Sequence, residues 1–471
     1  MPKQHFLDLF FNPESIAIVG ASRNPTSFNF NLVGNLVKLG FSGRIYPVNP
    51  SADEILGLRA YADLSGIEGD VDLVVSSVPA AMTLDVVKQC IEKKPKMVVL
   101  VTGGFSEIGE QGGKAQDEIA QLFRQGGIRV VGPNTLSPIN SSNNLVISFH
   151  PVEKLRQGGV AFIFQSGMYE FRLNWLLFDF HLGISKLIDF GNKMDVNEVD
   201  ALEYLAMDPD TKVIAMHLEV MKGDGKKFMQ LLTETSKRKP IVILKSGCTE
   251  AGARASASHT GSMIEGSDAV FDTVLRQAGV VRARTVEDFF YFAKSFEFLP
   301  LPRGNRIVIA SYSGGEGVVA TDICQREGFS MARLGQEAID KAEVVFPTWE
   351  IPLNPFDLGV CVQFHQVGEI YDILLEAILG DRGVDCLASQ LVPIPSSSVA
   401  ERLYGSFLAA KEKGKPIVLW RPVMDRVVNT LYEELVERLE LIHIPVYPSA
   451  ARAIQALSVV YRYKIMQEGA D

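Results

Sequence analysis

The stretch SIAIVGAS, residues 15–22, decides the fold expected for the N-terminal part of this 471-residue chain. Its apolar run ends in Gly20-Ala21-Ser22, the pattern of a buried parallel strand that turns sharply into a helix. Four similar runs end at residues 50, 79, 104 and 134, and amphipathic stretches such as residues 82–94 lie between them. This alternation predicts a parallel α/β domain of the Rossmann-like type, which we place at residues 1–150.

Two further α/β series follow this first one. The second opens with GGVAFIFQSGM (158–168), and the third opens with RIVIASYSGGEGV (306–318) after the proline-rich segment FLPLPRGN (298–305). The pattern therefore predicts an α/β protein with two more domains, at residues 151–300 and 301–471. The aromatic-rich stretches 172–183 and 288–299 repeat at helical spacing, which is typical of helix cores.

Both later domains begin with an apolar strand that ends in a Ser-Gly turn. Ser166-Gly167 ends one strand, and the run Ser313, Gly314, Gly315 and Gly317 surrounds the other turn. Small residues at such a turn let backbone N–H groups point at an anion, and the dipole of the following helix favours negative charge there. We therefore expect both turns to bind phosphate, gripping one group from two sides.

The composition excludes several classes of function. A net charge of −10 argues against a surface for nucleic acid or an anionic membrane, although a small anion can still be bound by backbone groups. No apolar run approaches the ~20 residues that span a bilayer, and we expect no signal peptide. The five cysteines form no CxxC pair, which predicts buried thiols in a reducing cytoplasm and no metal site.

The strand ends of the first domain suggest a nucleotide ligand. Gly20-Ala21-Ser22 lacks the full G-x-G-x-x-G pattern, and Asn49 stands where an NAD enzyme usually has an acid for the ribose hydroxyls. These features disfavour NAD and fit a nucleotide with a ribose phosphate, such as coenzyme A. Pro79 and Pro133-Asn134 end strands on the same expected edge. A simple tight turn without a ligand remains the alternative.

His259 is the candidate nucleophile of the second domain. It lies in the small-residue run ARASASHTGSM, which we expect to form a compact or mobile loop, and Glu219 ends the apolar run VIAMHLE. A carboxylate at that position can bond one ring nitrogen and leave the other free to attack. A structural role for this histidine remains open. We interpret His217 as structural, and the other histidines show no metal-ligand spacing.

Taken together, these residues resemble the nucleoside-diphosphate-forming acyl-CoA synthetases, relatives of succinyl-CoA synthetase. The resemblance covers nearly the whole chain and is strongest in KSGCTEAGARASASHTGSM (245–263). Other stretches that carry it are IAIVGASRNP (16–25), IYPVNP (45–50), GFSEIGEQG (104–112), GNKMDVNEVDALEYLAMDPDT (191–211), and SGGEGV (313–318) ahead of NPFDLG (354–359). It implies the α-subunit layout of a Rossmann-like CoA-binding domain followed by two flavodoxin-like domains.

The resemblance also implies roles for particular residues. The histidine that matches His259 is phosphorylated, and Glu219 matches the glutamate that orients it. CoA lies near the positions that match Gly20 to Ser22, Asn49, Pro79 and Pro133-Asn134. Phosphate attacks the acyl-CoA thioester, the histidine takes the phosphoryl group from the acyl phosphate, and ADP or GDP receives it. No P-loop is present, so ADP or ATP with Mg²⁺ is expected on a separate ATP-grasp β subunit, in a heterotetramer or larger assembly.

Some positions depart from the family pattern. Met168 follows Ser166-Gly167 where a small residue is usual, and Glu316 stands within the turn expected to hold phosphate. A carboxylate there opposes a second anion unless it points away. The main alternative is therefore a CoA- or acyl-CoA-binding regulatory protein that keeps the fold without turnover. An NAD-linked oxidoreductase is a weaker alternative, because both the glycine pattern and the terminal acid are missing.

Overall fold

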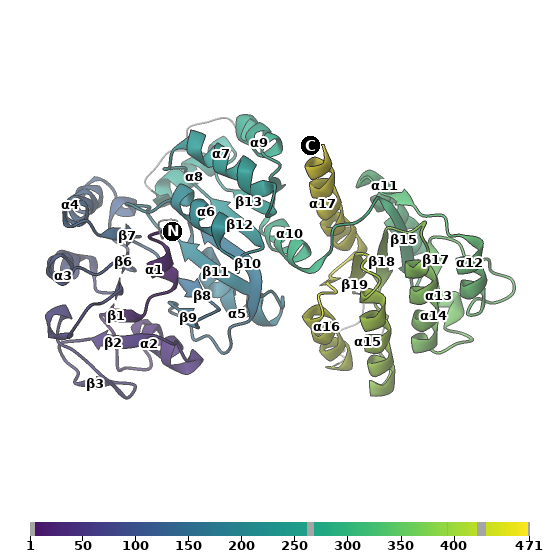
Figure 1. Ribbon diagram of the computed structural model, residues 1–471, viewed down its shortest axis with the longest axis horizontal. Coiled ribbons are helices and arrows are strands. Elements are labelled where there is room, and N and C mark those ends of the chain that lie inside the picture. Colours follow the sequence, from purple (N-terminus) through teal and green to yellow (C-terminus); the bar gives the residue numbers. More distant parts are fainter. Residues whose placement is uncertain (1–4, 261–267, 393, 422–429, 470–471) are drawn as a thin grey trace. The chain divides into compact units, whose positions relative to one another are not determined.

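The structure, a computed structural model, describes residues 5–260, 268–392, 394–421 and 430–469. The chain divides into two compact units, Met1–Phe289 and Phe290–Asp471, and helix α10 (Val286–Phe298) runs across the division. In the described residues, the first unit contains two large β-sheets and a two-stranded hairpin, and the second contains one large sheet; the large sheets are flanked by helices (Figure 1). The α/β class expected from the sequence is confirmed.

The first sheet is entirely parallel, in the order β2-β1-β5-β6-β7. Its central strands are buried at every residue, as expected for strands covered by helices on both faces. The strands are β1 (Ser15–Val19), β2 (Arg44–Val48), β5 (Leu73–Ser76), β6 (Met97–Leu100) and β7 (Arg129–Val131), and a small hairpin pairs β3 (Glu54–Ile55) with β4 (Leu58–Arg59). The helices are α1 (Asp8–Phe11), α2 (Phe28–Leu39), α3 (Ala80–Lys93) and α4 (Glu110–Gly126), with the 3₁₀ turns η1 (Leu64–Gly66) and η2 (Ser106–Ile108).

The second sheet has the order β14-β13-β12-β10-β11-β8-β9. Five of its strands are parallel, and β8 and β9 add an antiparallel edge. The strands are β8 (Ile139–Asn140), β9 (Leu145–Val146), β10 (Gln157–Phe164), β11 (Ile184–Asp189), β12 (Val213–Leu218), β13 (Ile241–Lys245) and β14 (Val281–Ala283). The helices are η3 (Gly167–Arg172), α5 (Leu173–Phe178), α6 (Glu198–Met207), α7 (Gly225–Ser236), α8 (Glu250–Thr260) and α9 (Asp268–Gln277).

Strands β8 and β9 lie before residue 150, yet they pair with the second sheet through β11. The chain therefore leaves the first sheet after β7 and reaches the second sheet by residue 139. The short runs of β8 and β9 carry no periodic signal of their own, because two-residue strands are defined only by their partners. The connection places the loop after β7 beside the second sheet.

The third sheet forms the core of the second unit, in the order β16-β15-β18-β19-β20, with β17 beside β15. All of its pairings are parallel. The strands are β15 (Arg306–Ser311), β16 (Ser330–Met331), β17 (Phe356–Asp357), β18 (Cys386–Gln390), β19 (Ile417–Trp420) and β20 (Val446–Tyr447). The helices are α11 (Gly314–Arg326), α12 (Gln336–Glu343), α13 (Leu358–Cys361), α14 (Val367–Gly380), α15 (Ser397–Lys411), α16 (Thr430–Leu441) and α17 (Ala450–Glu468).

Two expectations from composition can be compared with the structure. Four of the five cysteines are buried, and Cys248 is half-buried; none forms a disulfide. Burial raises the pKa of the Cys90 thiol to about 12, which makes it a poor nucleophile. Among the helices that the structure describes, none is long and apolar enough to span a membrane.

Close packing of β10 against the start of β11 generates a stability prediction. A Cβ at Gly183 would lie 2.4 Å from the Gln157 carbonyl oxygen, a contact that rigid backbone cannot relieve. We expect Gly183→Ala to lower the free energy of unfolding by about 2–4 kcal/mol in urea titrations. Gly405→Ala is the matched control, because Gly405 lies exposed within α15 with open space around it. The control should gain about 0.5–1 kcal/mol, and equal stability of the two variants would contradict the packing argument.

Candidate functional site

The turn after β1 is held tightly in place. Gly20 has φ +85°, and a Cβ there would lie 2.9 Å from the Ser77 hydroxyl, so the position requires glycine. The Asn29 amide donates hydrogen bonds to the Gly20 and Ser77 carbonyl oxygens, at 3.0 and 3.3 Å. The carboxyl ends of β1 and β5 are thereby fixed side by side, the edge where parallel sheets bind ligands.

Asn49 ties the end of β2 to the same edge. Its Nδ2 donates to the Ala21 carbonyl oxygen at 2.7 Å, and its Oδ1 accepts from the Ser51 N–H at 2.8 Å. Pro79 is the N-cap of α3, one connection away along the edge. The structure thus brings together the predicted positions Gly20 to Ser22, Asn49 and Pro79. The structure also shows that the Asn49 side chain joins the end of β2 to the turn after β1, a structural role that the sequence does not indicate.

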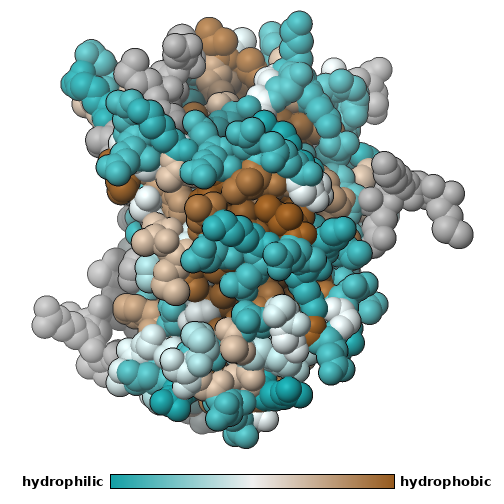
Figure 2. All heavy atoms as spheres, turned by 90° about the vertical axis from the view of Figure 1, so that its left-hand side faces the viewer, coloured by the Kyte–Doolittle hydropathy of each residue, from teal (hydrophilic) through white to brown (hydrophobic). Residues whose placement is uncertain are grey.

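Apolar surface lies beside these turns. Five large apolar side chains in the segments that connect the strands of the first sheet are exposed: Phe28, Val37, Leu56, Met82 and Ile108. In Figure 2, which faces the left-hand side of Figure 1, apolar side chains gather in the middle of the face between hydrophilic ones. An exposed apolar patch with a polar surround is typical of a surface that binds a ligand or a partner.

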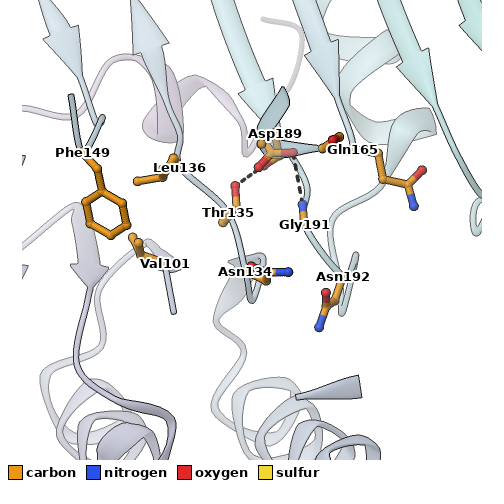
Figure 3. Close-up of a pocket in the computed structure, with 11 residues that line it drawn as sticks. Val101, Asn134, Thr135, Leu136, Phe149, Gln165, Asp189, Gly191 and Asn192 are labelled. Atoms are coloured by element: carbon orange, nitrogen blue, oxygen red, sulfur yellow. Dashed lines mark hydrogen bonds between the residues drawn. The ribbon is translucent and has the colours of Figure 1, made fainter. Parts of the chain in front are cut away.

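A pocket of about 260 Å³ joins the first domain to the second within the first unit. Its apolar side is formed by Val101, Leu136 and Phe149, and its polar side includes Asn134 and Gln165 (Figure 3). The remaining lining residues are Thr135, Ser166, Gly167, Asp189, Gly191 and Asn192. Of the residues predicted from the sequence, the pocket collects Asn134, Ser166 and Gly167. It therefore combines the predicted CoA edge with one predicted phosphate turn.

The two domains approach each other closely at one wall of this pocket. Gly191 has φ +53°, and a Cβ there would lie 2.1 Å from the Pro133 carbonyl oxygen. The Asn192 N–H donates to that same oxygen at 2.9 Å, and its side-chain amide donates to Glu107 at 2.6 Å. Glycine at position 191 is therefore required for the loop after β7 to reach the second sheet.

Gln165 determines where Glu219 lies. Its Oε1 accepts hydrogen bonds from the backbone N–H groups of Glu219 and Val220, at 3.0 and 2.9 Å. Glu219 follows β12 directly and is only 9% exposed. The strand end that carries the predicted orienting carboxylate is thus fastened to the wall of the pocket.

A buried ion pair holds the same segment from the other side. Lys193 Nζ lies 2.7 Å from Glu198 Oε2, both side chains are fully buried, and Nζ also donates to the Val220 carbonyl oxygen at 2.7 Å. Glu198 accepts from the backbone N–H groups of Lys222 and Gly223, at 2.8 and 2.7 Å. Burial favours the neutral acid, but Lys193 and these donors hold the pKa of Glu198 below its usual range.

Asp189 is a carboxyl group within the pocket that the sequence did not single out. It ends β11 and is 2% exposed, and its Oδ1 accepts a long hydrogen bond, 3.4 Å, from the Gly191 N–H. Its backbone carbonyl accepts from Thr135 Oγ1 at 2.6 Å. Burial raises the pKa of Asp189 to about 7. At a pH near 7 the carboxyl group can therefore be either protonated, and donate a hydrogen bond, or negatively charged.

The segment around His259 differs from the expected loop. Residues 250–260 form helix α8, because alanine, glutamate and arginine in this run are strong helix formers. His259 lies in its last turn, and its side chain and residues 261–267 lie outside the described residues. His217 is 3% exposed, contacts Ser246 Oγ through Nε2 at 2.7 Å, and has its pKa lowered to about 4 by burial. Its burial agrees with the structural role predicted for it.

The two predicted phosphate turns differ in strength. Ser166 caps η3, a six-residue 3₁₀ helix that continues into α5, and accepts the Met168 N–H at 3.3 Å, so a 3₁₀ helix stands where an α-helix was expected. In the second unit, Ser313 precedes the thirteen-residue helix α11. Glu316 in its first turn is fixed by two donors, Gln390 Nε2 at 2.9 Å and Trp420 Nε1 at 2.8 Å. That carboxylate already compensates the positive end of α11.

Sequence reasoning missed Asp189, Asn192 and Gln165 as individual site residues. The sequence places all three residues at the ends of predicted strands, where ligands bind: Asp189 and Asn192 follow the apolar run KLI, and Gln165 precedes Ser166-Gly167. The sequence does not show that these three strand ends share one pocket. Among the described residues, no cluster of His, Cys, Asp or Glu is arranged to hold a metal ion.

The buried carboxyl group of Asp189 generates a pH prediction. Its folded pKa of about 7 exceeds its ordinary value, so the folded protein binds a proton that the unfolded chain has released. The contribution of Asp189 to the stability of the wild type should therefore fall as pH rises from about 4 to 7, whereas Asp189→Asn lacks this loss. We expect the variant to gain up to ~4 kcal/mol relative to wild type between pH 4 and pH 8, measured by urea unfolding. A difference that does not change with pH would contradict this account.

Comparisons with known proteins agree with this arrangement. The family model described as CoA binding domain matches residues 14–139, and the one described as succinyl-CoA ligase like flavodoxin domain matches residues 157–296. The first match contains the strand ends from Gly20 to Asn134, and the second contains Gln165, Glu219 and His259.

Relatives match over nearly the whole chain. The α subunit of ADP-forming acetate–CoA ligase II from Pyrococcus furiosus is 35% identical over 92% of this chain and 93% of its own length. ADP-forming acetate–CoA ligase II from Archaeoglobus fulgidus is 35% identical over 97% of this chain, which spans 66% of that protein.

A solved structure of acetyl-coenzyme A synthetase 1 from Candidatus Korarchaeum cryptofilum, in complex with phosphate and ADP, superposes with a TM-score of 0.87. It is 33% identical, over 98% of this chain and 97% of that one. With its CoA-binding domain, its succinyl-CoA ligase-like domain and these full-length relatives, the chain belongs to the α-subunit family of the ADP-forming acetate–CoA ligases.

Proposed function

We propose that this chain is the CoA-binding and phosphate-carrying α subunit of a nucleoside-diphosphate-forming acid:CoA ligase. Such an enzyme interconverts acyl-CoA, ADP or GDP and phosphate with the carboxylic acid, ATP or GTP and free CoA. The observation that carries the proposal is the pocket in which Asn134 of the CoA-binding domain meets Gln165 to Gly167, while Gln165 anchors Glu219. The names of the relatives support the same reaction.

The proposed reaction begins at the thioester. Phosphate attacks the acyl carbon, the C–S bond breaks, and CoA leaves as its thiolate while an acyl phosphate forms. His259 then attacks the phosphorus, and the carboxylic acid leaves. Phosphoryl transfer requires positioning and charge compensation more than covalent help from the protein, and the backbone N–H groups of the Ser166-Gly167 turn can supply both.

Within this proposal, each site residue has a role. Glu219, held by Gln165 and by the Lys193 bond to Val220, orients the imidazole of His259 and stabilises the charge that develops on it. Gly20 to Ser22, Asn49, Pro79, Pro133 and Asn134 form the CoA edge. The turn from Ser313 to Gly317 is the second phosphate-binding element. Glu316 must be displaced for that turn to hold a dianion, because its carboxylate lies within the first turn of α11.

The last step requires a nucleotide site supplied by a partner. We propose an ATP-grasp β subunit that binds ADP with Mg²⁺ and receives the phosphoryl group from His259. Two facts support a second polypeptide or domain. The Pyrococcus furiosus relatives are named as α subunits, and the Archaeoglobus fulgidus protein extends well beyond the matched region.

Phosphorylation of His259 is the direct test. When the chain is incubated with acetyl-CoA and ³²P-labelled phosphate, we expect acid-labile, base-stable label that His259→Ala abolishes, because only the imidazole can carry it. His365→Ala is the matched control, because His365 is a half-exposed histidine of the second unit. The His365→Ala variant should be labelled like wild type. Equal labelling of His259→Ala would disprove the assignment. Tight CoA binding without any label would instead favour the regulatory alternative.

The anchoring of Glu219 gives a second test. Gln165→Met keeps the side-chain volume but removes the acceptor of two backbone N–H groups, so Glu219 should lose its fixed position. We expect the rate of His259 phosphorylation to fall about 10- to 100-fold, as for the loss of a buried acceptor worth 1–3 kcal/mol. Gln230→Met, on the exposed face of α7, is the control and should retain the wild-type rate. An unchanged rate in Gln165→Met would show that the anchor is dispensable.

A further inference from the structure

The amino edge of the third sheet carries a basic pocket that has no part in the proposed reaction. It lies where β15, β18 and β19 begin and is completed by α17, with a cavity volume of about 770 Å³. Six basic side chains line it: Arg303, Arg306, Arg382, Lys413, Lys415 and Lys464. The whole chain has a net charge of −10, so this concentration of positive charge runs against the overall balance.

Three of the six side chains are held in fixed positions. Arg306 forms a two-pronged contact with the buried Asp385, with Nε at 2.8 Å and Nη2 at 2.9 Å from its two oxygens. Lys415 Nζ donates to the Asp381 carbonyl oxygen at 2.6 Å, and Lys464 Nζ donates to the Arg303 carbonyl oxygen at 2.8 Å. Each lysine keeps further N–H donors for a ligand.

The acidic groups around the pocket are already engaged. Asp385 is taken by Arg306, Asp381 accepts the backbone N–H groups of Gly335 and Gly383, and Glu468 lies 3.0 Å from Lys464. The side chains of Arg303, Arg382 and Lys413 have no ion-pair or hydrogen-bond partner among the residues that the structure describes. A surplus of positive charge therefore faces the cavity.

The pKa of Lys415 is lowered mainly by burial. Asp381 and Asp385 oppose that effect, and the nearby charges of Arg303 and Arg306 lower the pKa further. Clustered cations of this kind repel one another until an anion compensates them.

We propose that this pocket binds an anion with two or more phosphoryl groups, an inorganic polyphosphate or a nucleoside polyphosphate. It lies at the opposite edge of the sheet from Ser313 to Gly317, which follow the carboxyl end of β15, so the site is distinct from the proposed phosphate turn. A ligand there would not take part in the chemistry of His259.

The geometry favours a polyphosphate over a single phosphate. Guanidinium groups match phosphate oxygens in pairs, and one dianion would not balance the charge of Arg303, Arg382 and Lys413, the three side chains without an ion-pair partner among the described residues. The cavity falls within the range of small-molecule sites, about 300–1,000 Å³. Tyr461 lines the same cavity, and Lys415 also lines a neighbouring cavity with Phe298, His443 and Ile444. A nucleoside bound in these cavities could pack against these apolar and aromatic groups.

Calorimetry on the full chain tests the proposal, with sodium tripolyphosphate and ADP as separate probes. We expect Arg382→Glu/Lys413→Glu to weaken binding of at least one probe about tenfold or more, as for the loss of charge-assisted hydrogen bonds. Both side chains are exposed, so the fold should survive, which circular dichroism melting would check. If both probes are weakened, the phosphates alone are recognised; if only ADP is weakened, the nucleoside is also required.

Lys226→Glu/Lys237→Glu is the matched control, because it changes the net charge equally at exposed positions of the first unit. The proposal is overturned if the Arg382/Lys413 variant binds both probes like wild type, or if neither probe binds the wild type at millimolar concentration. Tighter binding of single-stranded RNA than of tripolyphosphate would overturn it in favour of a nucleic acid. His259 labelling of the same variant should remain normal, which separates this result from the test of the proposed function.

Discussion

The completely buried ion pair between Lys193 and Glu198 is the interaction on which the geometry of the candidate site depends. Lys193 has φ +53°, an unfavourable backbone for a lysine, and the pair compensates that strain together with the bond to the Val220 carbonyl oxygen. Breaking such a pair by removing one partner costs about 3–5 kcal/mol, because the remaining charge stays buried. The pair therefore specifies one position for the strand end that carries Glu219.

The same turn connects two domains. Gly191 lets the backbone reach the Pro133 carbonyl oxygen, and Asn192 adds bonds to Pro133 and Glu107. A pocket built from two domains can bind CoA on one side and receive its thioester on the other. Burial raises the pKa of Asp189, a carboxyl group in this pocket. The lining of the pocket therefore combines apolar side chains with a titratable polar group.

The third sheet illustrates how a parallel α/β domain offers two different edges. At its carboxyl edge, Glu316 occupies the first turn of α11 and is bound by Gln390 and Trp420, so an incoming anion must compete with a resident carboxylate. At its amino edge, the acids are engaged by Arg306, Lys464 and backbone N–H groups, and uncompensated cations remain. The distribution of acidic side chains, more than the fold, decides which edge attracts a polyphosphate.

The sequence by itself determined the α/β class, the order of the buried strands and the residues at their ends, because apolar runs and small turn residues are local features. Its resemblance to known enzymes also predicts roles for His259 and Glu219, which stay predictions. The sequence misjudged residues 253–260 of the expected loop, where the helix propensity of alanine prevailed and the residues form part of α8. Only the tertiary structure decided that β8 and β9 join the second sheet, that Gln165 anchors Glu219, and that Asp189 is buried in the pocket. Those facts depend on contacts between residues far apart in the chain, which no local pattern encodes.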